Sequence, residues 1–349
     1  MKKNDIAARN MERRSFNKII VKGTIMSSMV QGVSSNYKRK SKPLKRGDKV
    51  GLITPAGIIT EERLIKTKAN LDALGLKYHH TQNVLLKEGY LAGADAIRLK
   101  ELHEMYADES IDAIWCIRGG YGTTRILDHI DFDLIKSNRK PLIGYSDITA
   151  LLNTIHQKTG SPCFHGPVAS STMTPFTTAN LAPIFGLDET HVISNSTMNI
   201  AKGLEEDVFK FRTITSGKAE GELVGGNLSL LVSLLGTDHE VKTKNKIVFI
   251  EDIGEAPYRI DRMLTQLISA GFFKKVKGIV LGIFAGCERK DYEKQTLQQV
   301  VHERVKRLQI PAMYGFSFGH IDDQCTFPIG AKAEIDADLG TVTLLEDGY

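Results

Sequence analysis

From residue 45 onward, short apolar runs alternate with stretches in which apolar residues recur every three or four positions. The short runs predict buried strands, and the longer period predicts amphipathic helices. Strands that alternate with helices are typical of βαβ units, so we expect a mainly parallel sheet with active groups at its carboxyl edge. In the first half of the chain we predict strands at 49–54, 77–84, 111–117 and a run ending at 144, and helices at 61–74, 95–107, a short one ending near 130, and one beginning at or just after 146.

The middle of the chain loses this regularity, because residues from about 169 to 221 are rich in Thr, Ser, Asn and Pro. Regular patterning then returns as a second α/β body. Its predicted helices are 228–235, 258–270 and 292–308, and its predicted strands are 247–251, 278–284, 312–316 and 341–345. We therefore expect an export leader and basic linker at 1–40, a first domain at 41–170, a connecting segment at 171–220 and a second domain at 221–349.

Composition agrees with a globular protein of two domains, since 42% of the 349 residues are hydrophobic and 25% are charged. No apolar run approaches the length of a membrane span. The formal charge is +5, but residues 1–35 alone carry seven Lys and Arg against Asp5 and Glu12. The remainder is therefore neutral, which argues against a nucleic-acid partner.

The N-terminus carries a separate signal. Arg13 and Arg14 are followed by Phe16 and Lys18 and then by a weakly apolar stretch at 19–33. This order resembles a twin-arginine export signal. We expect an exported, periplasmic protein that is not stably inserted in the membrane; the alternative is a basic leader on a cytoplasmic protein.

The run at 141–155 predicts a strand, a hinge at Gly144 and a helix that starts around Ser146. At such a sharp turn a serine side chain leaves the carboxyl edge of the sheet, and the first helical amides face the position of a carbonyl oxygen. The alternative is that Ser146 is only the N-cap of this helix, with Asp147 complementing the helix dipole.

The full hydrolase pattern GxSxG occurs elsewhere, at 315–319, with Ser317 at its centre. No apolar helical period follows Ser317, so no helix N-terminus serves it. We therefore assign the nucleophile elbow to Ser146, although its own pattern lacks the final glycine.

Neither a metal nor a cofactor is expected. The four cysteines are scattered singly, which argues against a zinc site and a disulfide framework but leaves one disulfide open. A zinc-peptidase helix beginning at His302 would need a second histidine where Lys306 stands. The turn with Gly120 and Gly122 has Arg125 where a dinucleotide fingerprint requires glycine.

A serine nucleophile needs a base, usually a histidine held by a carboxylate. His320 follows a predicted strand and a glycine-rich turn, which would deliver it to a cleft. Glu251 directly follows the apolar run 247–250 and is a candidate for this carboxylate, although the positions of Asp252 and Glu255 suit the role nearly as well. The other histidines stand mostly in helical or polar stretches.

Several separated motifs together resemble those of the murein LD-carboxypeptidases and their microcin-immunity relatives. The resemblance covers about 45–345, and the order of the motifs makes it more specific than any one of them. The motifs are RGGYG at 118–122, GYSD at 144–147, GGN at 225–227, IED at 250–252 with YRIDR at 258–262, and GFSFGH at 315–320.

This resemblance implies a flavodoxin-like parallel-sheet domain with the elbow and a C-terminal α/β domain of the swivelling type. It implies a serine peptidase with the triad Ser146, Glu251 and His320. The oxyanion hole would come from the backbone amides of Gly120 and Asp147. The implied reaction removes the terminal D-alanine of a murein tetrapeptide, and the implied assembly is a homodimer.

Recognition of the free substrate carboxylate needs a cation or a set of amides, and Arg118 and Arg259 are the candidates. Two other functions remain open from the sequence. One is a peptidase of the same fold that acts on peptidyl-nucleotide antibiotics of the microcin type. The other is a non-catalytic protein that binds muropeptides in a triad-like cleft.

Overall fold

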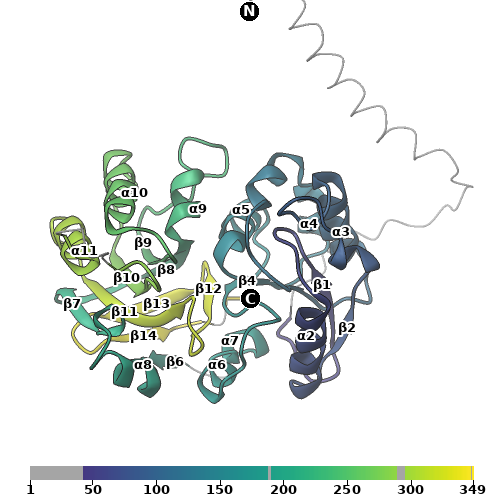
Figure 1. Cartoon of the computed structure of the whole chain (residues 1–349), viewed down its shortest axis with the longest axis horizontal. Helices are drawn as coiled ribbons and strands as arrows, with labels where there is room; N and C mark the ends of the chain where they lie inside the picture. The colour runs from purple at the N-terminus through teal and green to yellow at the C-terminus, as the bar shows by residue number, and fades with distance from the viewer. Residues whose placement is uncertain (1–41, 188–189, 289–294, 347) are drawn as a thin grey trace, which may run out of the picture. The chain divides into compact units, whose positions relative to one another are not determined.

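The computed structural model describes residues 42–187, 190–288, 295–346 and 348–349. The predicted export leader and basic linker, residues 1–40, lie outside these residues. The described residues fall in one compact unit, which is built around two β-sheets with helices packed on their faces (Figure 1).

The first sheet has the strand order β12-β5-β4-β3-β1-β2, in which β1 to β5 are parallel. An order of 2-1-3-4-5 is that of flavodoxin-like sheets, so the predicted fold of the first domain is confirmed. Its strands are β1 (Lys49–Ile53), β2 (Lys77–His79), β3 (Ala113–Cys116), β4 (Leu142–Gly144), β5 (Cys163–His165) and the antiparallel edge strand β12 (Phe327–Ile329), and its helices are α2 (Glu61–Ala73), α3 (Asp95–Ala107), α4 (Phe132–Ser137) and α5 (Thr149–Thr159).

The second sheet is mixed, with the order β6-β14-β13-β8-β9-β10-β11-β7. Its central strands β8 to β11 are parallel, and the strands on both sides of them are antiparallel. Helices α9 (Leu228–Ser233), α10 (Pro257–Ser269) and α11 (Leu297–Lys306) connect the parallel strands. The strands are β6 (His191–Ser194), β7 (Arg212–Thr215), β8 (Lys218–Asn227), β9 (Lys246–Glu251), β10 (Gly278–Ile283), β11 (Ala312–Gly319), β13 (Lys332–Asp336) and β14 (Thr341–Leu344).

The segment 171–220 differs from the connecting segment that we expected. It contains α6 (Pro175–Ala179), α7 (Ala182–Phe185), α8 (Thr197–Lys202), the edge strands β6 and β7, and the start of β8. Both edge strands are short and have only one buried residue each, so they lack the continuous apolar run that marks a central strand. The sequence pattern also did not predict strands β12 and β13. Strand β12 lies in the C-terminal part of the chain but pairs with β5 of the first sheet.

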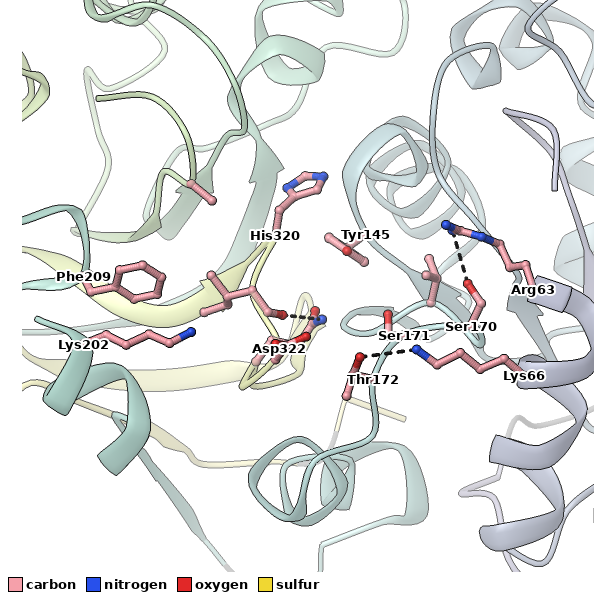
Figure 2. Close-up of a pocket in the computed structure, with 14 residues that line it drawn as sticks. Arg63, Lys66, Tyr145, Ser170, Ser171, Thr172, Lys202, Phe209, His320 and Asp322 are labelled. Atoms are coloured by element: carbon pink, nitrogen blue, oxygen red, sulfur yellow. Dashed lines mark hydrogen bonds between the residues drawn. The ribbon is translucent and has the colours of Figure 1, made fainter. Parts of the chain in front are cut away.

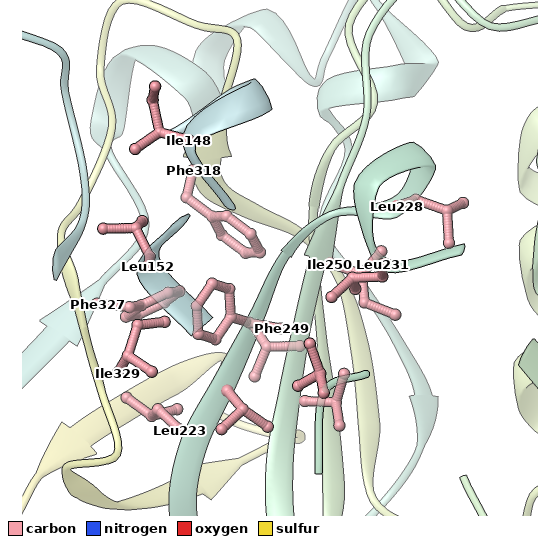
Figure 3. Close-up of a cluster of buried hydrophobic side chains, with 14 of the residues drawn as sticks. Ile148, Leu152, Leu223, Leu228, Leu231, Phe249, Ile250, Phe318, Phe327 and Ile329 are labelled. Atoms are coloured by element: carbon pink, nitrogen blue, oxygen red, sulfur yellow. The ribbon is translucent and has the colours of Figure 1, made fainter. Parts of the chain in front are cut away.

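One apolar cluster runs from the inner face of the first sheet into the second sheet. Figure 3 shows Ile148 and Leu152, next to the elbow, together with Phe249, Phe318 and Phe327. The ring centroids of Phe249 and Phe327 and those of Phe318 and Phe327 are each 5.1 Å apart, as in favourable aromatic pairs. This shared core ties the helix behind Ser146 to the strands that carry Glu251 and His320.

Candidate active site

Ser146 occupies a strained turn directly after β4. Its φ is +64°, a left-handed value that L-residues rarely adopt outside special turns. A single 3₁₀ turn, Ser146–Ile148, precedes α5, which begins only at Thr149. The hinge at Gly144 has a packing reason, because a Cβ there would lie 3.0 Å from the Cγ2 atom of Ile148. The elbow predicted from the sequence is therefore present, with its helix starting slightly later than expected.

The side chain of Ser146 does not cap the helix. Tyr145 and Ile148 hold the N-cap positions of the 3₁₀ turn and of α5, and neither position has a side-chain capping hydrogen bond. The Ser146 hydroxyl instead lies 2.9 Å from Nε2 of His320. The interpretation of Ser146 as only an N-cap is therefore wrong.

Two strands of the second sheet place a histidine and a carboxylate next to the hydroxyl of Ser146. His320 follows the last residue of β11, and Glu251 is the last residue of β9. Nδ1 of His320 lies 2.7 Å from Oε2 of Glu251. Asp252, by contrast, accepts hydrogen bonds from the backbone and side chain of Ser229. Of the carboxylates that the sequence left open, Glu251 is the one that contacts the imidazole; Glu255 pairs with Arg259.

Burial and mutual attraction set the charge states of this pair. Glu251 is fully buried, which disfavours its charged form, but the adjacent His320, together with His165 and the side chain of Asn227, outweighs this effect and lowers the pKa of Glu251. Burial likewise disfavours the charged form of His320, and the carboxylate of Glu251 outweighs it and raises the pKa of His320 above 6.5. The carboxylate thus stabilises the protonated form of the imidazole, the species that a histidine forms when it acts as a general base.

The glycine turn at 118–122 packs directly against the elbow. A Cβ at Gly119 would lie 3.0 Å from the Cβ of Ser146 and 3.3 Å from the backbone nitrogen of Asp147. The amide of Gly57 donates to the carbonyl of Gly119 at 3.0 Å, and Gly120 has a φ of +116°. The structure therefore brings the turn that carries the Gly120 amide next to the Asp147 amide.

The Asp147 side chain holds the two loops together. Its carboxylate is buried and accepts the amide of Thr123 at 2.9 Å, while the hydroxyl of Thr123 donates to the Asp147 carbonyl at 2.6 Å. Burial raises the pKa of Asp147, although these hydrogen bonds oppose the shift. The carboxylate of Asp147 thus anchors the glycine turn to the elbow.

The GGN motif of β8 fixes the elbow helix against the second sheet. The side-chain amide of Asn153 on α5 donates to the carbonyl of Gly225 at 2.8 Å, and the amide of Asn227 donates to the hydroxyl of Thr149 at 3.0 Å. A Cβ at Gly226 would lie 2.4 Å from that hydroxyl oxygen. The glycines permit a close approach that sets the position of Ser146 relative to Glu251 and His320.

A cleft of about 390 Å³ opens beside Tyr145 and His320 (Figure 2). Arg63 and Lys66 of α2 line one side of it, and Lys202 of α8 lines the other. The cleft is thus bordered by three cations and one carboxylate, Asp322, and this excess of positive charge favours an anionic ligand.

Family models for the N-terminal and C-terminal domains of LD-carboxypeptidases match residues 50–166 and 220–335. The chain belongs to the LD-carboxypeptidase family. It is 41% identical to the "Probable murein peptide carboxypeptidase" of Bacillus subtilis, with 88% of this chain and 94% of the relative covered. It is 31% identical to the "Murein tetrapeptide carboxypeptidase" of Pseudomonas aeruginosa, with 82% and 93% covered.

Solved structures of the family share this fold. The muramoyltetrapeptide carboxypeptidase of Oxalobacter formigenes matches with a TM-score of 0.72 and 29% identity, over 85% of this chain and 97% of that one. The protein MccF in complex with glutamyl sulfamoyl guanosine matches with a TM-score of 0.79 and 26% identity, over 88% and 98%. The family thus includes both murein carboxypeptidases and a microcin-immunity protein.

The two arginines that the sequence suggested for this LD-carboxypeptidase lie in different places. Arg118 is half-buried beside the glycine turn, in a second hollow that also contains Gly120 and Tyr121. Arg259 is exposed on α10, pairs with Glu255 at 3.3 Å and does not line the cleft. Sequence reasoning missed Arg63, Lys66 and Lys202, because charged residues at helical spacing are indistinguishable from a solvated helix face.

The described residues contain no group of three or more His, Cys, Asp or Glu side chains that could hold a metal ion. All four cysteines are free and buried, so the one disulfide that the sequence left open does not form. Within the same residues, no helix is both long and apolar enough to span a bilayer.

Proposed function

We propose that this protein is a serine LD-carboxypeptidase that removes the terminal D-alanine from murein tetrapeptides. The observation that carries the proposal is the continuous hydrogen-bonded chain from Ser146 through His320 to the buried Glu251. Membership in a family with relatives named murein peptide and murein tetrapeptide carboxypeptidases supports the substrate.

In this mechanism the neutral imidazole of His320 accepts the Ser146 proton as the hydroxyl oxygen attacks the scissile carbonyl. Glu251 stabilises the imidazolium, and the amides of Gly120 and Asp147 donate to the oxyanion. His320 then gives its proton to the departing amino group of D-alanine. Water, deprotonated by the same imidazole, hydrolyses the acyl-enzyme and regenerates Ser146.

Mass spectrometry of a murein tetrapeptide incubated with the protein tests this proposal. We expect a tripeptide and free D-alanine from the wild type, and neither from Ser146→Ala. A matched control is Ser317→Ala, which removes the serine of the other motif, and we expect it to keep the activity. Undiminished release by Ser146→Ala would refute the assignment.

The likeness to MccF supports a second candidate, hydrolysis of aminoacyl or peptidyl nucleotides of the microcin type. Parallel assays with a tetrapeptide and with glutamyl sulfamoyl guanosine distinguish the two. We expect a higher kcat/KM for the tetrapeptide, and the reverse order would favour the second candidate.

We further propose that residues 1–40 direct export to the periplasm by the twin-arginine route and that the mature protein is a homodimer. The Arg13-Arg14 pair before a weakly apolar stretch supports the first proposal. A variant with both arginines replaced by lysine should remain in the cytoplasm, and export of that variant would refute the route.

Sedimentation equilibrium tests the proposed homodimer, and a molecular mass equal to that of one chain would exclude it.

A further inference from the structure

Two arginines lie near the start of the glycine turn. Arg63 contacts the hydroxyl of Ser170, which donates to the carbonyl of Ile117, the residue before Arg118. Arg63 lies on α2 and lines the cleft with Tyr145, and Arg118 begins the turn that carries Gly120. Among the described residues, neither guanidinium lies within ion-pair distance of an acidic side chain. Burial in the cleft and then the positive charge of Arg118 lower the pKa of Arg63, so the two charges repel each other.

Neutral oxygens hold both guanidinium groups. Nη1 of Arg63 donates to the hydroxyl of Ser170 at 3.5 Å, and Nη1 of Arg118 donates to the carbonyl of Ile58. These contacts supply no counter-charge, and the charge of Arg63, which is exposed, is balanced by solvent. A guanidinium offers five donors in a planar fork that matches a carboxylate. An arriving carboxylate would therefore relieve the repulsion and gain charge-assisted hydrogen bonds.

The position of the pair suits the leaving residue of a carboxypeptidase. An exopeptidase must place the terminal carboxylate one residue beyond the scissile bond, which lies at Ser146. Arg118 is joined directly to the glycine turn that packs on Ser146, and Arg63 shares the cleft with Tyr145 and His320. In Figure 2, Arg63 lies on the side of the cleft opposite Lys202.

The opposite end of the cleft has room for the longer, acyl part of a peptide. Lys202 and Asp322 line both the cleft and a further hollow of about 450 Å³ that contains residues of α6 and α8. The two hollows thus adjoin at this end. The part of the substrate before the scissile bond fits here, which leaves the arginine end to the single residue that departs.

We propose that Arg63, which lines the cleft, binds the C-terminal carboxylate of the substrate and makes the enzyme a carboxypeptidase rather than an endopeptidase, with the positive charge of Arg118 beside the glycine turn adding to the attraction. This inference rests on the proposed function. Arg63 is then a specificity-determining residue whose charge selects peptides with a free terminus.

The test compares a murein tetrapeptide with the same peptide carrying a C-terminal amide, using the full-length protein and its Arg63→Gln variant. We expect Arg63→Gln to lower kcat/KM for the free acid by about 10- to 100-fold, as for a lost hydrogen bond to a charged group, and to change the amide little. Arg63→Lys should restore part of the preference for the acid. The control is Lys68→Gln on the same helix, where the ammonium faces Tyr78, and it should match the wild type for both peptides.

An equal loss for acid and amide would overturn the inference, because it would indicate a general role in shaping the cleft. So would an unchanged preference for the acid in Arg63→Gln. Labelling of Ser146 by a fluorophosphonate at the wild-type rate shows that the variant is folded with its triad intact. If the wild type cleaves neither peptide, the proposed function itself fails; if it cleaves both and the variant keeps the preference, only the role of Arg63 fails.

Discussion

Replacing Glu251 by glutamine removes one charge from the proposed triad and keeps its shape. The carboxylate is fully buried and 2.7 Å from Nδ1 of His320, so the amide oxygen of glutamine can still accept that N–H. What disappears is the attraction between the carboxylate and the imidazolium. At an effective dielectric constant of about 20 and a separation of about 4 Å, this attraction is on the order of 4 kcal/mol.

That energy corresponds to a loss in kcat of about 10³-fold, since each 1.4 kcal/mol or so is about tenfold. The pH profile supplies an independent readout. His320 acts as a base only when neutral, so kcat/KM of the wild type should rise with pH through a pKa above 6.5, because Glu251 raises it. In Glu251→Gln this acidic limb should move to lower pH while the plateau falls.

The assay is D-alanine release from a tetrapeptide across the pH range. Glu222→Gln is a matched control, because Glu222 lies on the neighbouring strand β8 and is 46% exposed beside Lys246. We expect this control to keep the wild-type profile. If Glu251→Gln retained kcat within about threefold of the wild type with an unmoved acidic limb, the proposed role of the carboxylate would be wrong.

Three further predictions concern residues around the triad. Burial lowers the pKa of His165 to about 4, so the unfolded chain binds a proton at a higher pH than the folded chain does. The free energy of unfolding should therefore fall by on the order of 3 kcal/mol between about pH 6.5 and pH 4. Urea titrations should show a smaller fall for His165→Phe, and an equal fall would contradict this. Gly119→Ala places a methyl group against Ser146, so we expect kcat to fall by about tenfold or more while the melting temperature stays at the wild-type value. A fully active variant would argue against the close contact between the glycine turn and Ser146. Ser317 is buried and hydrogen-bonded to Asn195 and to the amide of Ser196, so Ser317→Ala should lower the free energy of unfolding by about 1–3 kcal/mol and leave kcat unchanged.

The positions of Ser146 and His320 could be predicted from the sequence for a physical reason, whereas only the family resemblance separated Glu251 from Asp252 and Glu255. Ser146, Glu251 and His320 each follow or end an apolar strand, and the carboxyl ends of parallel strands carry active groups. The structure also explains why the better serine motif is a decoy. Ser317 lies inside the buried strand β11, so its hydroxyl serves the packing of that strand.

Other features depend on contacts that no local pattern records. The short strands β6 and β7 are stabilised by the sheet that they border, and β12 joins the first sheet although it lies far along the chain. The cleft cations are similar. Arg63 and Lys202 come from helices remote in sequence, and only tertiary folding places them on opposite sides of one cleft.

The most direct test of the account is to locate the residue that a serine-directed fluorophosphonate modifies. Peptide mapping after labelling should find the adduct on Ser146, with a labelling rate that rises with pH as His320 loses its proton and that collapses in His320→Ala. An adduct on Ser317, or no adduct on a protein that still releases D-alanine, would contradict the central claim that Ser146 is the nucleophile.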